Sequence, residues 1–200
     1  RGLGDVYKRQ VLRHPKGRGL VKKRIKVKLG DLGRAIDQVE QYKAQLREKC
    51  RVFLGRLSEL GVQTADVRFR TAQYDGTNDV ETLAEWEGDN KVKVIARGRS
   101  VTFIEFGAGV YYSEAHPLAD SKGAIRGEYG QGKGKHITWG YYGDPGTNGR
   151  VATDKDGHPI VRDEGPVILT HGNPPARAMY EASKAMREEI KKIAKEVFGS

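Results

Sequence analysis

The sequence predicts an α+β fold in which a long helix near the N-terminus and a second helix at the C-terminus pack on an antiparallel β-meander. Apolar side chains recur at three-and-four spacing in residues 30–61 and 173–198, as in amphipathic helices. Between residues 80 and 106 they alternate with polar ones, as in strands exposed on one face. With 200 residues the chain is long enough for one such domain.

The first predicted helix is preceded by a short alternating segment, residues 24–29, that we expect to form a strand. Asp31 is the expected N-cap of the helix, and Gly61 followed by Val62 suits a glycine C-cap. A helix of this length would lie across a whole sheet or against a neighbouring subunit. Its apolar stripe consists of Ile36, Val39, Leu46, Cys50, Phe53, Leu57 and Leu60.

Three alternating runs follow, at residues 80–87, 92–96 and 101–106, and turn residues at 88–90 and 98–99 separate them. This arrangement predicts a three-stranded antiparallel meander. Residues 64–74 are expected to add a fourth strand or an edge segment.

Residues 107–148 are rich in glycine and have little helical periodicity, so we expect a long loop inserted in the domain. A local hairpin around Asp156 and Gly157 is expected within residues 149–163. The C-terminal helix should be capped by Asn173, with two prolines in its first turn. Its predicted stripe consists of Met179, Ala182, Met186, Ile190, Ile193 and Val197.

The formal net charge of +10 comes from the N-terminal segment. Residues 1–28 contain eleven basic side chains and one acid, and the rest of the chain has equal numbers of acidic and basic residues. The first ten residues, "RGLGDVYKRQ", resemble a translated sequencing adaptor. We therefore expect residues 1–20 to be an artefact or a disordered tail, and residues 21–200 to form a single domain.

Residue types and spacing argue against catalysis and against a cofactor. Cys50 is the only cysteine, which excludes an intrachain disulfide and a cysteine-based zinc site. No two histidines have the close spacing of a metal motif. A metal hydrolase would need tertiary proximity of a larger set, namely His116, His136 and His171 with Glu105 or Asp144. Asp154 and Asp156 lack a third ligand before the glycine and are better explained as a turn.

The sequence also bears on two other classes of partner, nucleic acids and membranes. A nucleic-acid-binding module would use the basic tail together with Lys133, Lys135 and Trp139, since aromatic rings beside lysines stack on bases. The neutral body of the protein weakens this alternative. A membrane partner is not expected, because no apolar run approaches the roughly 18 to 20 residues needed to span a bilayer.

Three segments together resemble a known family. The helix "LGRAIDQVEQYKAQLREKCRVFLGRLSELGVQTA", the segment "VTFIEFGAGVYYSEAHP" and the ending "THGNPPARAMYEASKAMREEIKKIAKEVF" are similar to the head-tail joining, or tail-completion, proteins of long-tailed bacteriophages and prophages. The similarity runs from about residue 25 to residue 198. Its most specific elements are "FIEFGAG" and "NPPARAM".

The resemblance implies a structural protein without enzyme activity. It would form a ring, commonly of six copies, in the neck of the virion, between the head connector or head-closure proteins and the tail-tube or tail-terminator proteins. It would be assembled in the cytoplasm of the bacterial host, and DNA would be only passing cargo. The expected interface residues are Glu105, Phe106, Gly107, Tyr111, Tyr112, Trp139, Tyr141 and Tyr142.

Overall fold

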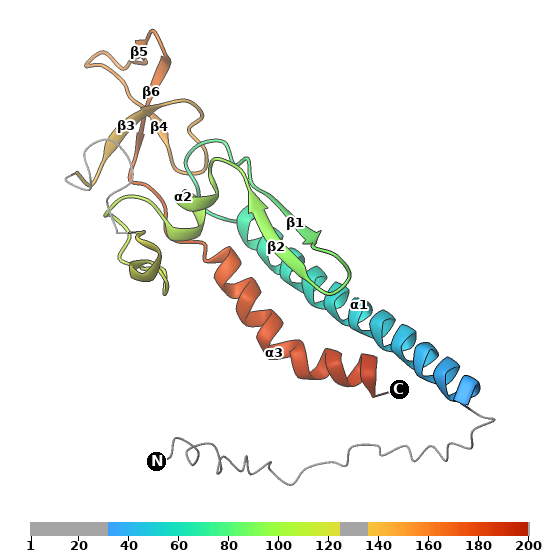
Figure 1. Ribbon diagram of the computed structural model, residues 1–200. Helices are drawn as coiled ribbons and strands as arrows, with labels where there is room; N and C mark the ends of the chain where they lie inside the picture. The colour runs from blue at the N-terminus through green and yellow to red at the C-terminus, as the bar shows by residue number, and fades with distance from the viewer. Residues whose placement is uncertain (1–31, 125–135, 200) are drawn as a thin grey trace, which may run out of the picture. The chain divides into compact units, whose positions relative to one another are not determined.

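The computed structural model describes residues 32–124 and 136–199, and confirms an α+β fold (Figure 1). The predicted strand at 24–29, the Asp31 cap and the N-terminal tail lie outside these residues. Two units are distinguished, Arg1–Lys43 and Ala44–Ser200. Of the first unit only the beginning of helix α1 is described.

Helix α1 spans Leu32–Arg70 and is longer than the sequence predicted. The expected end at Gly61 is wrong, and so is the expected strand or edge segment at 64–74, because the helix continues through most of it. Gly61 is buried inside the helix, where a Cβ atom would lie 2.7 Å from the sulfur of Met186 and 2.9 Å from a methyl of Val94. The glycine therefore serves close packing of α1 against its neighbours.

The predicted meander contains only two strands. β1 (Glu81–Trp86) and β2 (Val92–Arg97) form the expected antiparallel hairpin. The third segment is instead a short helix, α2 (Val101–Phe106). Helical spacing brings Ile104 and Glu105 into the buried interior, and Asp79 accepts the backbone N–H groups of Arg99 and Ser100 just before the helix begins.

A second antiparallel sheet is formed within residues 139–170. β3 (Trp139–Tyr142), β4 (Arg150–Val151) and β5 (Val161–Arg162) all pair with β6 (Gly165–Thr170). The predicted loop at 107–148 thus contains β3, and also the short 3₁₀ helix η2 (Asp120–Lys122). The expected local hairpin is confirmed by the antiparallel bridge between Thr153 and Pro159.

The C-terminal helix α3 spans Ala178–Phe198. Its predicted cap at Asn173 is wrong, because the chain remains extended through both prolines and turns into the helix at Arg177, where φ is 55°. Asn173 is nevertheless buried, and its side-chain amide donates to the carbonyl of Phe103. Most of the predicted stripe faces the protein, but Ile190 is exposed.

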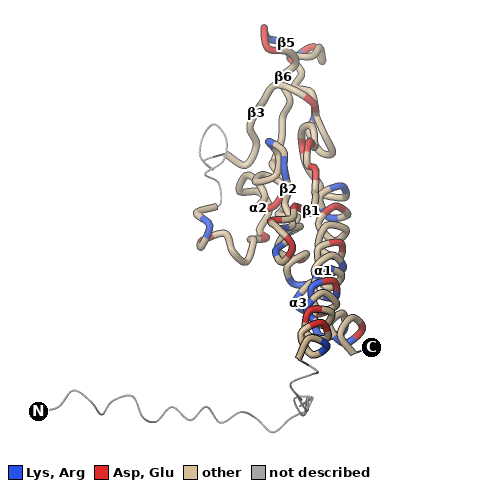
Figure 2. The backbone as a smooth tube through the Cα atoms, turned by 45° about the vertical axis from the view of Figure 1, so that its right-hand side comes forward, with Lys and Arg blue, Asp and Glu red and all other residues tan. Residues whose placement is uncertain are grey.

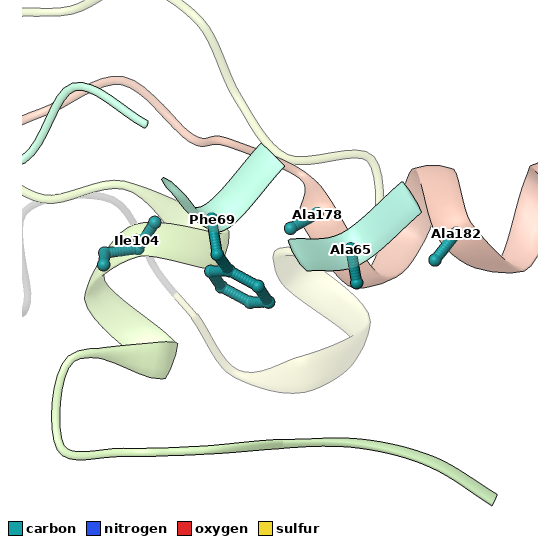
Figure 3. Packing of buried hydrophobic residues seen from close by; sticks show 5 residues of the cluster. All are labelled: Ala65, Phe69, Ile104, Ala178 and Ala182. Atoms are coloured by element: carbon teal, nitrogen blue, oxygen red, sulfur yellow. The ribbon is translucent and has the colours of Figure 1, made fainter. Parts of the chain in front are cut away.

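The core is a contact between three helices. Ala65 and Phe69 of α1, Ile104 of α2, and Ala178 and Ala182 of α3 form one buried cluster (Figure 3). Alanines on α1 and α3 allow the two helices to approach closely, and Phe69 fills the space at their ends. Val80 and Ala96 bring the β1–β2 hairpin onto this cluster.

Within the second unit, α1 and α3 run antiparallel beside each other (Figure 1). The start of α3 contacts α1 at Ala65, and the other end places Phe198 5.7 Å from Phe53, measured between ring centroids. An ion pair of 3.1 Å joins Arg56 to Glu196 near that end. Figure 2 shows basic and acidic residues interspersed along both helices.

A substitution at Gly61 tests the close approach in this core. We expect Gly61→Leu to lower the free energy of unfolding by about 2 kcal/mol, because a larger side chain would collide with Met186 and Val94. Gly55→Ala is the matched control, since its Cβ would meet only an ordinary contact, 3.9 Å from Trp86, and alanine favours the helix. Chemical denaturation followed by circular dichroism measures both; equal stability of the two variants would contradict the assigned packing.

Asp79 gives a pH-dependent test. Hydrogen bonds from the backbone N–H groups of Arg99 and Ser100 hold the pKa of Asp79 well below its ordinary value of 3.8. A carboxyl group whose pKa is lower in the folded than in the unfolded state stabilises the protein at pH values above its unfolded-state pKa. This stabilisation is lost as the pH falls through the folded-state pKa. Asp79→Asn should therefore lower the melting temperature at pH 7, and the difference from the unsubstituted protein should shrink below about pH 4. A difference that grows towards acid pH would contradict the assignment.

Candidate functional site

Glu105 lies at the junction of α2 and α3 and is 5 % exposed. Its two carboxylate oxygens accept the backbone N–H groups of Met179, at 2.9 Å, and Tyr180, at 3.1 Å. These groups belong to the first turn of α3, whose N–H groups have no partners within the helix and favour a negative charge nearby. Glu105 therefore caps α3 from another element.

His116 completes this buried group. Its Nε2 lies 3.1 Å from the Glu105 carboxylate, and its Nδ1 accepts the backbone N–H of Leu118 at 3.0 Å. Because Nδ1 is used as an acceptor, the neutral ring carries its proton on Nε2 and donates it to Glu105. The ring also packs against Phe106, with 4.5 Å between centroids. Of these two predicted interface residues, Glu105 is buried and Phe106 is half-buried.

The two most specific motifs of the sequence contact each other directly. In "FIEFGAG" and "GNPP", Ala108 and Asn173 exchange two backbone hydrogen bonds of 3.0 and 3.1 Å. Gly107 has φ 79°, and a Cβ there would lie 2.8 Å from the nitrogen of Pro175. The close approach of the two backbones therefore requires glycine at position 107, and the role of Gly107 in an interface stays a prediction.

The predicted aromatic interface residues differ in exposure. Tyr111 is 56 % exposed, stacks on His171 at 4.8 Å between centroids, and meets Tyr112 edge-on. Trp139 is half-buried, at a place where a Cβ on Gly109 would collide with its ring. Of these rings, Tyr111 is the one most available to another molecule.

β3 carries the remaining two predicted residues on opposite faces. Tyr141 is half-buried, donates its hydroxyl to the carbonyl of Asp144, and has a pKa raised to about 12, mainly by burial and also by the charge of Asp75. Tyr142 is exposed. Alternation along the strand explains the difference, because successive side chains point to opposite faces of a sheet.

A cleft of about 420 Å³ opens between α2, the segment around His116 and α3. Its apolar wall includes Val101, Phe106, Leu118 and Met179, and Glu105 and His116 also line it. Three exposed cations contribute to the same cleft: Lys122, Lys184 and Arg187. Lys184 and Arg187 are three residues apart on α3, so they lie on one face of the helix. The sequence reasoning missed these cations; their helical spacing was the available signal.

The alternative metal site is not assembled. In the described part of the chain, three potential ligands come within 4.8 Å of one another only at Asp154, Asp156 and His158, all exposed. There, Asp154 accepts the backbone N–H groups of the other two, which is the expected turn. The set that a metal hydrolase would need, His116, His136 and His171 with Glu105 or Asp144, is not brought together among the described residues.

The nucleic-acid alternative gains little from the structure. Lys133 and Lys135 lie outside the described residues. Trp139 is half-buried, with the end of its ring packed against Gly109 and Gly172.

The apolar face of α1 is covered over only part of its length. Leu57 is buried, and Phe53 and Leu60 are half-buried. Towards the N-terminus the same face carries further apolar side chains, interrupted at Lys43, and these are exposed by 41 to 56 %: Leu32, Ile36, Val39 and Leu46. Scattered apolar side chains on a surface are ordinary, whereas several gathered on one face indicate an interaction site.

Among the residues described, no helix is both long and apolar enough to cross a membrane. Comparisons with known protein families, with curated proteins and with solved structures find no match for this chain.

Replacing Glu105 tests the junction. We expect Glu105→Ala to lower the free energy of unfolding by about 3 kcal/mol, because it leaves two backbone N–H groups and the His116 N–H buried without their acceptor. Glu114→Gln is the matched control: its carboxylate is exposed and 3.9 Å from Arg177, so a change below about 0.5 kcal/mol is expected. Thermal and denaturant unfolding measure both. Equal, small effects would show that Glu105 does not hold the junction.

Proposed function

We propose that this protein is a structural subunit of the neck of a long-tailed bacteriophage or prophage, where it joins the head connector to the tail tube. It acts without catalysis, as one copy in a ring, commonly of six subunits. Its partners are further copies of itself, the connector or head-closure proteins and the tail-tube or tail-terminator proteins. DNA passes through the ring without specific binding, and the mature location is the virion.

The observation that carries this proposal is the exposed row on α1. Leu32, Ile36, Val39 and Leu46 follow the spacing of the buried part of the same face, yet remain 41 to 56 % exposed. Burying such side chains stabilises a complex by about 25 cal/mol for each Å² of apolar surface removed from water. A subunit contact that repeats around the ring buries this surface. The resemblance of "FIEFGAG" and "NPPARAM" to the head-tail joining family supports a location of the ring in the neck of the virion.

The charge distribution also favours assembly over nucleic-acid binding. From residue 29 onward the chain has equal numbers of acidic and basic residues. A ring through which DNA passes must not attract the DNA phosphates as strongly as a basic DNA-binding surface does, and a subunit without net charge meets this requirement.

The assembly is tested on the full chain by sedimentation velocity and electron microscopy, alone and with connector and tail-tube proteins of a long-tailed phage. Rings, or a defined complex with either partner, support the proposal. A strict monomer at all concentrations that binds neither partner contradicts it.

Substitutions on α1 test the surface itself. Ile36→Lys combined with Val39→Lys should weaken self-association by about tenfold or more, because charged side chains oppose burial of this face. The melting temperature should not change, since both side chains are largely exposed in the isolated chain. Gln38→Lys combined with Gln41→Lys adds the same charge to the other side of the helix and should assemble normally. Equal assembly by both variants would exclude this face from the contact.

A further inference from the structure

The cleft between α2 and α3 has the chemistry of a receptor for an apolar side chain accompanied by carboxylates. Its apolar wall lies next to three cations: Lys122, Lys184 and Arg187. None of the three side chains forms an ion pair with another described residue. At the base of the cleft, the Glu105 carboxylate is already occupied by two backbone N–H groups and His116. Among the described residues, the charges of this cleft that lack an ion-pair partner are therefore positive.

The complementary feature is the turn between β5 and β6. Arg162 pairs with Gly165, so Asp163 and Glu164 form a two-residue turn whose carboxylates are exposed. Neither carboxylate has an ion-pair partner among the described residues. Val161 in β5 is 63 % exposed, the largest value of any exposed large aliphatic side chain in the described part. The turn thus presents one apolar side chain and two negative charges, with Arg162 as the single positive charge between them.

We propose that the β5–β6 turn of one copy, with Val161, Asp163 and Glu164, docks into the α2–α3 cleft of a second copy. The inference rests on the proposed function and specifies one contact of the ring. Cleft and turn are different patches of the same chain, so the contact is heterologous and repeats from copy to copy, as a ring requires.

Charge and shape favour this occupant. Lys184 and Arg187 supply two cations on one helix face for the two adjacent carboxylates, while Val161 faces the apolar wall. A cleft of about 420 Å³ has the size that binding pockets use to enclose several side-chain groups. The hairpin turn is fixed by its backbone pairing, which reduces the entropy lost on docking.

Two charge-reversed full-length variants test the contact. The cleft variant carries Lys184→Glu and Arg187→Glu, and the turn variant carries Asp163→Lys and Glu164→Lys. By sedimentation velocity, each variant alone should have a self-association Kd raised by about a hundredfold, because like charges would face each other. An equimolar mixture should regain assembly. The acidic cleft of the cleft variant can bind the basic turn of the turn variant, and the basic cleft of the turn variant can bind the acidic turn of the cleft variant.

Matched controls separate this contact from general charge effects and from misfolding. Lys191→Glu with Lys195→Glu reverses two exposed charges on α3 outside the cleft, and Asp156→Lys reverses one in the neighbouring hairpin. These controls should assemble like the unsubstituted chain, and circular dichroism should show that every variant keeps its fold.

Three results would overturn the inference while the proposed function stands: normal assembly of both variants, loss of assembly in the cleft variant alone, or two impaired variants whose mixture is not restored. If the unsubstituted chain forms no ring and binds neither connector nor tail-tube protein, the proposed function fails and the inference fails with it.

Discussion

The carboxylate of Glu105 connects three segments that are far apart in the sequence. It belongs to α2, accepts two N–H groups at the start of α3, and holds His116 in the intervening segment. All three partners donate hydrogen bonds, so an ionised carboxylate satisfies them and is itself stabilised by the end of the helix. The direction of α3 and the position of the segment around His116 both depend on this group, and so does the cleft that they form.

The backbone that follows Glu105 also packs closely against the segment that leads into α3. Ala108 and Asn173 are joined by two hydrogen bonds, and a side chain at Gly107 would collide with Pro175. Only a residue without Cβ tolerates such contact at a positive φ. This explains why the two distinctive motifs, "FIEFGAG" and "NPPARAM", occur together: each supplies one side of the same junction. Their chemistry is structural.

The fold class, the β1–β2 hairpin and the turn at Asp156 were predictable because each depends on neighbouring residues. The predictions from sequence were wrong where a contact between residues far apart in the chain determines the local structure. Val101–Phe106 has β-branched and aromatic residues in a run too short to show helical periodicity. It is a helix because Asp79 accepts the backbone N–H groups of Arg99 and Ser100, which fixes the turn before it, and because the helix buries Ile104. The residues around Gly61 are typical of a helix end, but Gly61 packs against Met186 and lies inside α1. The cap of α3 comes from Glu105, not from Asn173. Of the predicted interface residues, Tyr111 and Tyr142 are exposed, Phe106 is half-buried in the wall of the cleft, and Glu105 is buried.

The composition of the core bears on how the protein works. Alanines make up most of the buried helix cluster, and Phe69, Ile104 and Ile168 are the largest side chains fully buried in the described part. Alanine buries little apolar surface, so the helix contact gains less from the hydrophobic effect than one made by large aliphatic residues. At the same time, larger apolar side chains of α1 lie exposed in a row. In the proposed assembly, contacts with other copies bury the apolar surface that the chain leaves exposed, and binding of this kind stabilises the folded chain.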